Sequence, residues 1–288
     1  MGVLIYAYEM KTKSLLVALC LCLFVSKISG MDFSEQENAF LEELLQFRLT
    51  LRSYDTDDQV IEKVREFKSG KINQISTFSD EAQLVFTNML ATAEYNGFYA
   101  KDMHAPEMEG ILRPQYEKII AFRENVPVEE QNPWFVFTSA DIVNSMMQFL
   151  KQGEAISLGL KEKKEYAIAL AAQPEHAFGN MLSGYWYYYA PGIGGGSKKK
   201  ARLFFANALE YAANDYERFY GNINLSQMNF EDKNKEEAAR LLDEAEKILT
   251  GTRHVAFIRK INEMGYSAFD YNQNSTRKKL DEHLAEEK

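Results

Sequence analysis

Two segments of this chain carry the same helical pattern 37 residues apart. Small and large apolar residues recur at positions i, i+4 and i+7 in both: Ala201, Phe205 and Ala208 in the first, and Ala238, Leu242 and Ala245 in the second. Gly184 and Gly221 share the same offset. This spacing places side chains on one face of an α-helix. A period of this length is typical of stacked pairs of antiparallel helices.

Nearly every segment from residue 34 onward also predicts α-helix. Cap residues and apolar stripes indicate helices over 34–53, 56–70, 79–100, 107–123, 138–150, 158–172, 175–189, 198–213, 215–228, 234–249 and 253–266. The apolar run Trp134–Phe137 is compatible with a strand, a buried loop or the start of a helix. No segment alternates polar and apolar residues as a half-buried strand does.

The sequence therefore predicts an all-α fold. Residues 138–271 are expected to form antiparallel helical hairpins stacked as an α-solenoid, behind an irregular helical region at 31–137. The tail at 272–288 is polar and charged, and such termini are commonly frayed. The whole chain of 288 residues is 46% hydrophobic, enough for one large domain or two modest ones.

The first thirty residues have the three parts of a secretory signal peptide. Lys11 and Lys13 precede an apolar run from Leu15 to Val25, and small residues end at Gly30. Residues 1–9 are expected to lie upstream of the true start. The run is short for a bilayer, and no later segment is long and apolar enough to span one.

These features predict an exported bacterial protein that is periplasmic or secreted, with no transmembrane segment in the mature chain. Two alternatives remain: a lipid anchor on Cys20 or Cys22, or an uncleaved signal anchor. Both cysteines lie in the leader, so the mature chain is expected to contain neither disulfide nor thiolate. The net charge of −9 repels polyanions, which argues against a nucleic-acid partner.

The repeat resembles the tetratricopeptide family. Ala201, Phe205 and Ala208 match the pattern of that family's second helix, and Gly184 matches the small residue of its first helix. The match departs from the family because glycine and alanine are 17 residues apart, where the family consensus implies about 12. The proline that often follows the second helix is also missing. The resemblance implies a helical scaffold that binds a protein or peptide.

A narrower resemblance concerns the stretch YYYAPGIGGGSKKKA. It is similar to a tyrosine-rich helix, a Pro-Gly-Gly loop and a Lys-Ala helix in exported proteins associated with TRAP-type solute transporters. That resemblance implies periplasmic capture of a small organic ligand. As a phosphate loop the stretch fits poorly, because a helix precedes it and Ser197 stands where the P-loop has glycine. A flexible loop with Ser197 as the helix N-cap is favoured, with phosphate binding at the helix start as the alternative.

Five consecutive aromatic residues precede that loop: Tyr185, Trp186, Tyr187, Tyr188 and Tyr189. Successive helical residues are about 100° apart, so these side chains cannot all face one core. They are predicted either to pack on two sides or to form a surface for a ligand or partner, with Tyr185, Tyr187 and Tyr188 as the contacts. Tyrosine suits such surfaces because its hydroxyl keeps a polar partner.

No constellation of an enzyme is recognisable. The four histidines His104, His176, His254 and His283 form no HExxH motif, and we expect them on the surface or at helix caps. No catalytic, cofactor-binding or metal-binding residue is predicted. The expected function is a non-catalytic exported scaffold for a protein, peptide or small organic ligand. The alternative is a periplasmic accessory protein of a TRAP-type transporter that binds or hands over a small ligand.

Overall fold

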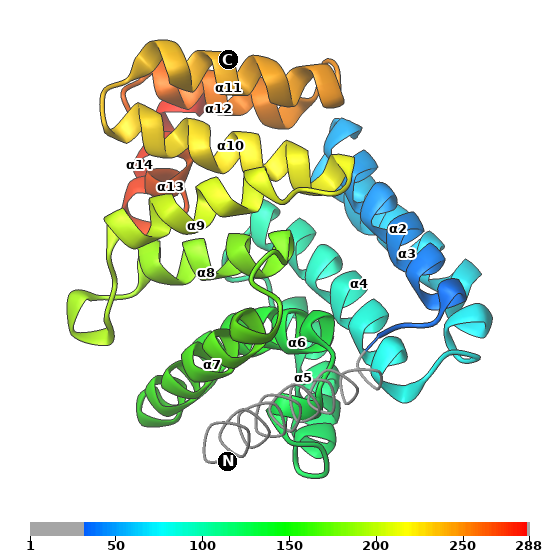
Figure 1. Ribbon diagram of the computed structural model, residues 1–288. Helices are drawn as coiled ribbons and strands as arrows, with labels where there is room; N and C mark the ends of the chain where they lie inside the picture. Colours follow the sequence, from blue (N-terminus) through cyan, green and yellow to red (C-terminus); the bar gives the residue numbers. More distant parts are fainter. Residues whose placement is uncertain (1–31, 287–288) are drawn as a thin grey trace, which may run out of the picture.

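The structure is a computed structural model that describes residues 32–286. No β-strand occurs in this range, so the all-α prediction is confirmed for it. The α-helices are α2 (Glu35–Thr50), α3 (Asp57–Ile75), α4 (Asp80–Lys101), α5 (Glu107–Arg123), α6 (Pro133–Met146), α7 (Gln152–Ala172), α8 (Ala177–Tyr189), α9 (Lys198–Glu210), α10 (Asp215–Glu231), α11 (Lys235–Ile248), α12 (Arg253–Glu263), α13 (Ala268–Tyr271) and α14 (Asn274–Glu286) (Figure 1).

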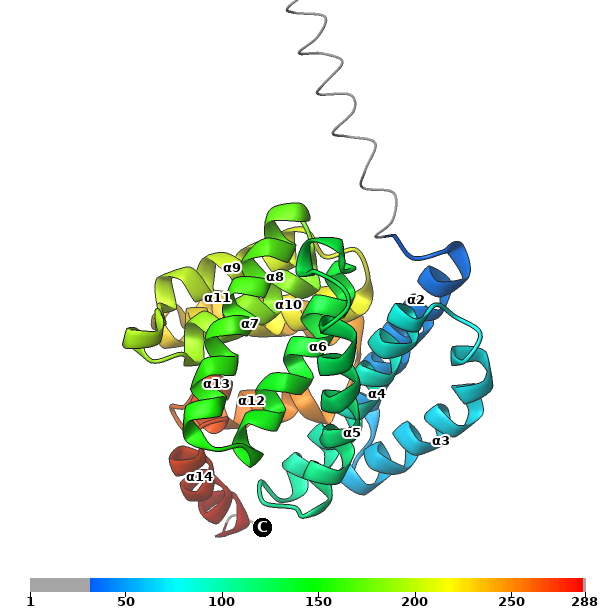
Figure 2. The ribbon, with the colours of Figure 1, turned by 90° about the horizontal axis from the view of Figure 1, so that it is seen from below.

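Helices α8 to α11 lie side by side in sequence order, each packed on the next, with α13 and α14 behind them (Figure 1). Helices α4, α5 and α6 pack on one another between the α2–α3 side and α7 (Figure 2). Helix α2 packs against α10, and the 3-10 turn Leu51–Ser53 packs against α12. One contact between them is the hydrogen bond from Thr252 Oγ1 to the Arg52 carbonyl oxygen, 2.7 Å long. The turn after α2 therefore meets the start of α12.

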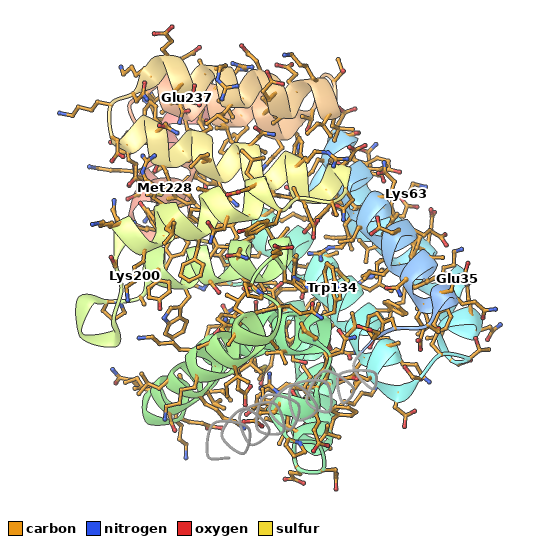
Figure 3. All side chains as sticks on the ribbon, in the orientation of Figure 1. Glu35, Lys63, Trp134, Lys200, Met228 and Glu237 are labelled. Atoms are coloured by element: carbon orange, nitrogen blue, oxygen red, sulfur yellow. The ribbon has the colours of Figure 1, made fainter. Side chains whose placement is uncertain are left out.

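The start of α6 is set by its N-cap residue, whereas the apolar pattern alone did not determine it. Asn132 Oδ1 accepts a hydrogen bond from Trp134 N at 2.9 Å, and Pro133 occupies the first helical turn. The run Trp134–Phe137 is thus a helix start, and the start expected at residue 138 was wrong. Trp134 lies where α6 meets α8 (Figure 3), with its ring centroid 5.2 Å from that of Phe178. The boundary expected between residues 137 and 138 falls inside α6.

The prediction of a frayed tail was also wrong. Residues 274–286 form α14, in which the side chains of Arg277 and Leu280 are buried. Arg277 Nη2 donates a hydrogen bond to the Ala100 carbonyl oxygen at 2.6 Å. The segment is polar on average, but this contact with the end of α4 and the burial of Leu280 hold it as a helix.

The predicted leader, with Cys20 and Cys22, lies outside the described residues. Within residues 32–286, no helix is both long enough and apolar enough to cross a bilayer.

The apolar residues of the 37-residue pattern are all buried: Ala201, Phe205, Ala208, Ala238, Leu242 and Ala245. The two glycines that share the 37-residue offset each lie where another helix comes close, but the contacts differ. A Cβ atom on Gly184 would lie 2.4 Å from the ring of Phe205 in the neighbouring α9. On Gly221 it would lie 3.0 Å from Leu209 Cα, so α10 approaches the preceding helix α9 at that point.

The contact at Gly184 predicts that Gly184→Ala destabilises the fold by about 1–3 kcal/mol, because the added methyl group overlaps a buried ring. The matched control is Gly70→Ala on α3, where a Cβ atom has no neighbour within 4 Å. That change should stabilise the protein by about 0.5–1 kcal/mol, since alanine favours a helix interior. Urea denaturation of the two variants measures the difference. Equal midpoints would contradict the packing described.

Candidate functional site

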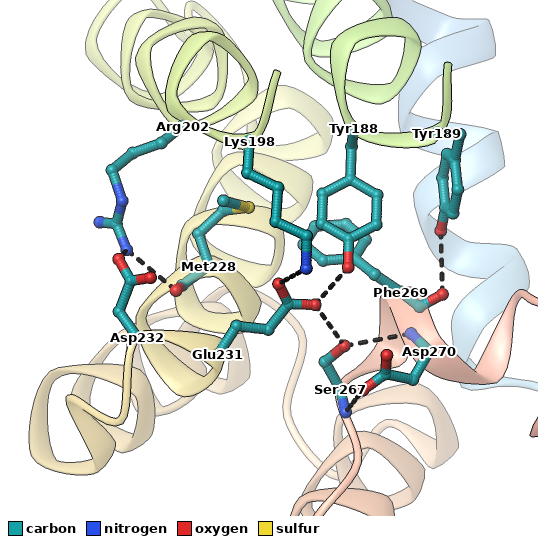
Figure 4. Close-up of polar contacts among 10 residues, drawn as sticks. All are labelled: Tyr188, Tyr189, Lys198, Arg202, Met228, Glu231, Asp232, Ser267, Phe269 and Asp270. Carbon is teal, nitrogen blue, oxygen red and sulfur yellow. Dashed lines mark hydrogen bonds and ion pairs between the residues drawn. The ribbon is translucent and has the colours of Figure 1, made fainter. Parts of the chain in front are cut away.

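The five aromatic residues of α8 face different neighbours. Tyr188 is buried, and its hydroxyl donates to Glu231. Tyr189 is 40% exposed, and its hydroxyl donates to the Phe269 carbonyl oxygen at 3.5 Å (Figure 4). Tyr185 lines a cavity described below. The run therefore does not form one continuous surface.

The remaining two aromatic residues of the run lie on the side of α7 and α9. A Cβ atom on Gly159 of α7 would lie 3.3 Å from the Trp186 ring, so α7 passes close to that indole. The Tyr187 ring stacks on Phe204 with centroids 5.2 Å apart and planes 5° apart. The Lys200 ammonium lies 5.1 Å from the Tyr187 centroid. Inter-helix packing accounts for these contacts.

Glu231 at the end of α10 connects three other elements (Figure 4). Its carboxylate accepts from Tyr188 of α8, pairs with Lys198 of α9 at 2.6 Å, and accepts from Ser267 Oγ at 2.8 Å, just before α13. Charge-assisted hydrogen bonds of this kind are stronger than neutral ones. At the lysine-rich start of α9, Lys198 thus has a structural role as the ion-pair partner of Glu231.

Ser197 caps α9, as predicted. Its Oγ accepts a hydrogen bond from Lys200 N at 3.3 Å. Gly195 has φ of 90°, a left-handed conformation that favours glycine. The Lys163 ammonium donates to the Gly194 carbonyl oxygen at 2.9 Å and so ties the loop to α7. The loop is held by its own backbone and by α7.

A cavity of about 530 Å³ lies where the N-terminal and C-terminal helices meet. Residues from α2, α3, α4, α8, α10, α12, α13 and α14 contribute to its wall. Aromatic side chains form much of this lining: Tyr99, Tyr185, Tyr216, Tyr220, Phe257, Phe269 and Tyr271. The cavity therefore depends on segments more than 200 residues apart.

Four arginines and one aspartate supply the lining charges: Arg48, Arg52, Arg253, Arg277 and Asp57. The aspartate is not free, because Arg253 Nη2 lies 2.5 Å from Asp57 Oδ1. Arg277 Nε lies 3.5 Å from Asp281. The cavity is consequently electropositive within an acidic chain.

The other two arginines lie against tyrosine rings of α10. Arg52 Nε donates to Tyr220 Oη at 2.5 Å, and the Arg48 guanidinium lies 5.2 Å from the centroid of Tyr216. Burial raises the pKa of the Tyr216 phenol, although Arg48 opposes the shift. Burial likewise raises the pKa of Tyr185. Both phenols are thus neutral near pH 7 and add no negative charge.

His254 corrects the expectation that every histidine lies on the surface or at a cap. It lines the cavity, where burial, together with the charges of Arg52 and Arg253, lowers its pKa to about 3. His176 does act as a cap, because its Nδ1 accepts from Gly179 N at 3.1 Å. Because His254 is neutral, the positive charge of the cavity comes from its arginines.

Sequence reasoning missed most of the cavity. Arg48 follows Leu41 and Leu44 by seven and four residues, which places an arginine on the core face of α2. The position of Arg48 on that face could have indicated a buried polar site, because an arginine is rarely fully buried unless it is paired. The identity of the opposing tyrosines could not be deduced, since α2 and α10 are distant in sequence.

Among residues 32–286, no three His, Cys, Asp or Glu side chains gather closely enough to hold a metal ion. No protein-family model matches the chain, and no curated protein matches it in sequence. The function is therefore inferred from the cavity itself.

The depressed pKa of His254 predicts a pH-dependent stability. The unfolded chain takes up a proton on this histidine near pH 6.5, whereas the folded chain does so only near pH 3. The contribution is fully present above pH 6.5 and falls as the pH decreases toward 3. Urea unfolding should show that wild type loses about 2 kcal/mol more than His254→Asn between pH 7.5 and 5.

The control for this measurement is His104→Asn, at an exposed position before α5. It should keep the pH dependence of the wild type. If His254→Asn kept that dependence too, the buried neutral imidazole would not be its source.

Proposed function

We propose that this protein is a non-catalytic binding protein that encloses a small organic ligand in its central cavity. The observation that carries the proposal is the volume of about 530 Å³ bounded by seven aromatic rings. Ligand pockets of about 300–1,000 Å³ with mostly apolar walls and a few polar groups are the usual sites for small molecules. The cavity has this size, and its wall combines the aromatic rings with arginines, asparagines and other polar side chains.

A stacked-hairpin α-solenoid in the tetratricopeptide manner is part of the proposal for α8 to α11. The 37-residue pattern and the packing of α8 on α9 and of α10 on α11 support it. The cavity would then lie on one face of the stack, with α2 and α4 opposite. Those helices supply Arg48, Tyr99 and other wall residues, and the turn after α2 supplies Arg52.

The place of action belongs to the same proposal. The leader pattern supports export to the periplasm or secretion, and the tyrosine-rich helix before the Pro-Gly loop supports an accessory role beside a TRAP-type transporter. In that role the protein would bind a solute and hand it over. A cavity of the size of a small ligand suits such a carrier better than a flat scaffold surface does.

A scaffold for a protein or peptide is the second candidate. Ile156 and Leu160 lie one helical turn apart on α7 and are 59% and 48% exposed. Exposed apolar side chains on one helix face are a common feature of partner surfaces. Binding in the cavity and binding on α7 can be tested separately.

A cavity-filling variant tests the proposed function. Ala268→Trp places a large ring at a half-buried lining position, whereas Ala239→Trp adds the same ring on the exposed side of α11. A panel of small organic acids, amides, alcohols and lipids is screened by thermal shift. A ligand at 100 times its Kd stabilises the native state by about 2.7 kcal/mol.

We expect some panel members to raise the melting temperature of the wild type and of Ala239→Trp, but not that of Ala268→Trp. Circular dichroism checks that both variants are folded. Equal shifts in all three proteins would place binding outside the cavity. The absence of any shift, combined with capture of a peptide that Ile156→Asp abolishes, would favour the scaffold.

A further inference from the structure

We propose that the ligand carries a carboxylate and that Arg52, Arg48 and Asn224 bind it. The inference rests on the proposed function, because it names the chemical class of the molecule in the cavity. Its basis is the juxtaposition of two guanidinium groups with a buried amide that still has an unused donor. The remaining aromatic wall would enclose an apolar body.

The three side chains come from α2, from the 3-10 turn that follows it, and from α10. Arg48 and Arg52 are four residues apart, at the end of α2 and in the 3-10 turn that follows. On α10, Tyr216, Tyr220 and Asn224 repeat every four residues and so share one face. The Tyr216 and Tyr220 centroids are 4.8 Å apart, and each ring lies beside one of the two arginines.

Two buried donors in this group have no hydrogen-bond acceptor among the described residues. One is Nη1 of Arg48, a residue only 8% exposed, and the other is Nδ2 of Asn224, only 3% exposed. The other end of the Asn224 amide is occupied, because Oδ1 accepts from Tyr185 Oη at 2.8 Å. Buried donors without acceptors are uncommon in proteins. Each therefore lacks an acceptor that a ligand in the cavity could supply.

Arg52 makes no ion pair with a described carboxylate, and its Nε donates to the Tyr220 hydroxyl. The other cavity arginines differ, since Arg253 pairs with Asp57 and Arg277 with Asp281. The charge of Asp141 acts on Arg48, but no ion pair joins them, and burial raises the pKa of Asp141. Positive charge therefore remains available where the cavity meets α10.

The donor geometry favours a carboxylate in particular. A guanidinium presents parallel N–H groups that match the two oxygens of a carboxylate. Cations are disfavoured because the lining aspartate is already paired with Arg253. Tyr99, Phe257 and Tyr271 supply apolar surface elsewhere in the wall. An aryl or alkyl carboxylate fits both parts.

Isothermal titration calorimetry with 4-phenylbutyrate and its neutral amide tests the proposal. We expect wild type to bind the carboxylate at least tenfold more tightly than the amide. Arg52→Gln should lose at least tenfold in affinity for the carboxylate and leave amide affinity unchanged. The affinity of Arg52→Lys for the carboxylate should be intermediate, because lysine keeps the positive charge but lacks the parallel N–H groups of the guanidinium. Arg218→Gln, an exposed arginine of α10 paired with Asp215, is the matched control.

Asn224→Asp gives an independent readout should Arg52→Gln fold poorly. It retains an acceptor for Tyr185 but places a negative charge beside the arginines, so carboxylate affinity should fall at least tenfold. Equal affinities of wild type for the two probes, or an unaffected Arg52→Gln, would overturn the carboxylate proposal and leave cavity binding standing. Inorganic phosphate competing as well as 4-phenylbutyrate would also overturn it. If no panel ligand bound, both proposals would fail.

Discussion

The burial of α10 around most of its circumference is the constraint on which the rest of the structure depends. Its buried side chains occupy consecutive positions around the helix, and several are polar. Each polar group then needs a partner from a neighbouring helix. Gln227 and Asn262 exchange two amide hydrogen bonds of 3.1 and 3.0 Å, and Ser226 Oγ donates to the Ala238 carbonyl oxygen at 2.8 Å. These bonds fix α11 and α12 around α10.

The same constraint explains where the cavity lies. On the side that faces α2, α10 presents Tyr216 and Tyr220, whose rings are buried and whose hydroxyls bring polar groups to this contact. Arginines from α2 and its following turn occupy that side and keep their charge beside the phenols. The bond between Thr252 and the Arg52 backbone then joins the start of α12 to the turn after α2. A cavity remains where these long polar side chains meet.

The sequence predicted helices well wherever a local cap was present. Ser34 and Glu37 form a capping box at the start of α2, and Ser197 caps α9. The errors came from tertiary contacts, since Arg277 and Leu280 order a tail that is polar on average. The site was harder to predict for the same reason. Tyr185 was predicted as a contact residue from the sequence. Arg52 and Asn224 were not, because they line a common cavity only when the α2 region packs against α10.

Preorganisation gives the cavity its chemical character. Tyr220 accepts from Arg52 and lies beside it, so the guanidinium is oriented without a carboxylate competing for it. A ligand that meets donors already in place loses less free energy to ordering than one that must assemble its site. Because the site spans α2 and α10, bound ligand would also join the two halves of the chain. Ligand binding would thus be linked to folding, because a ligand that binds only the folded chain stabilises it.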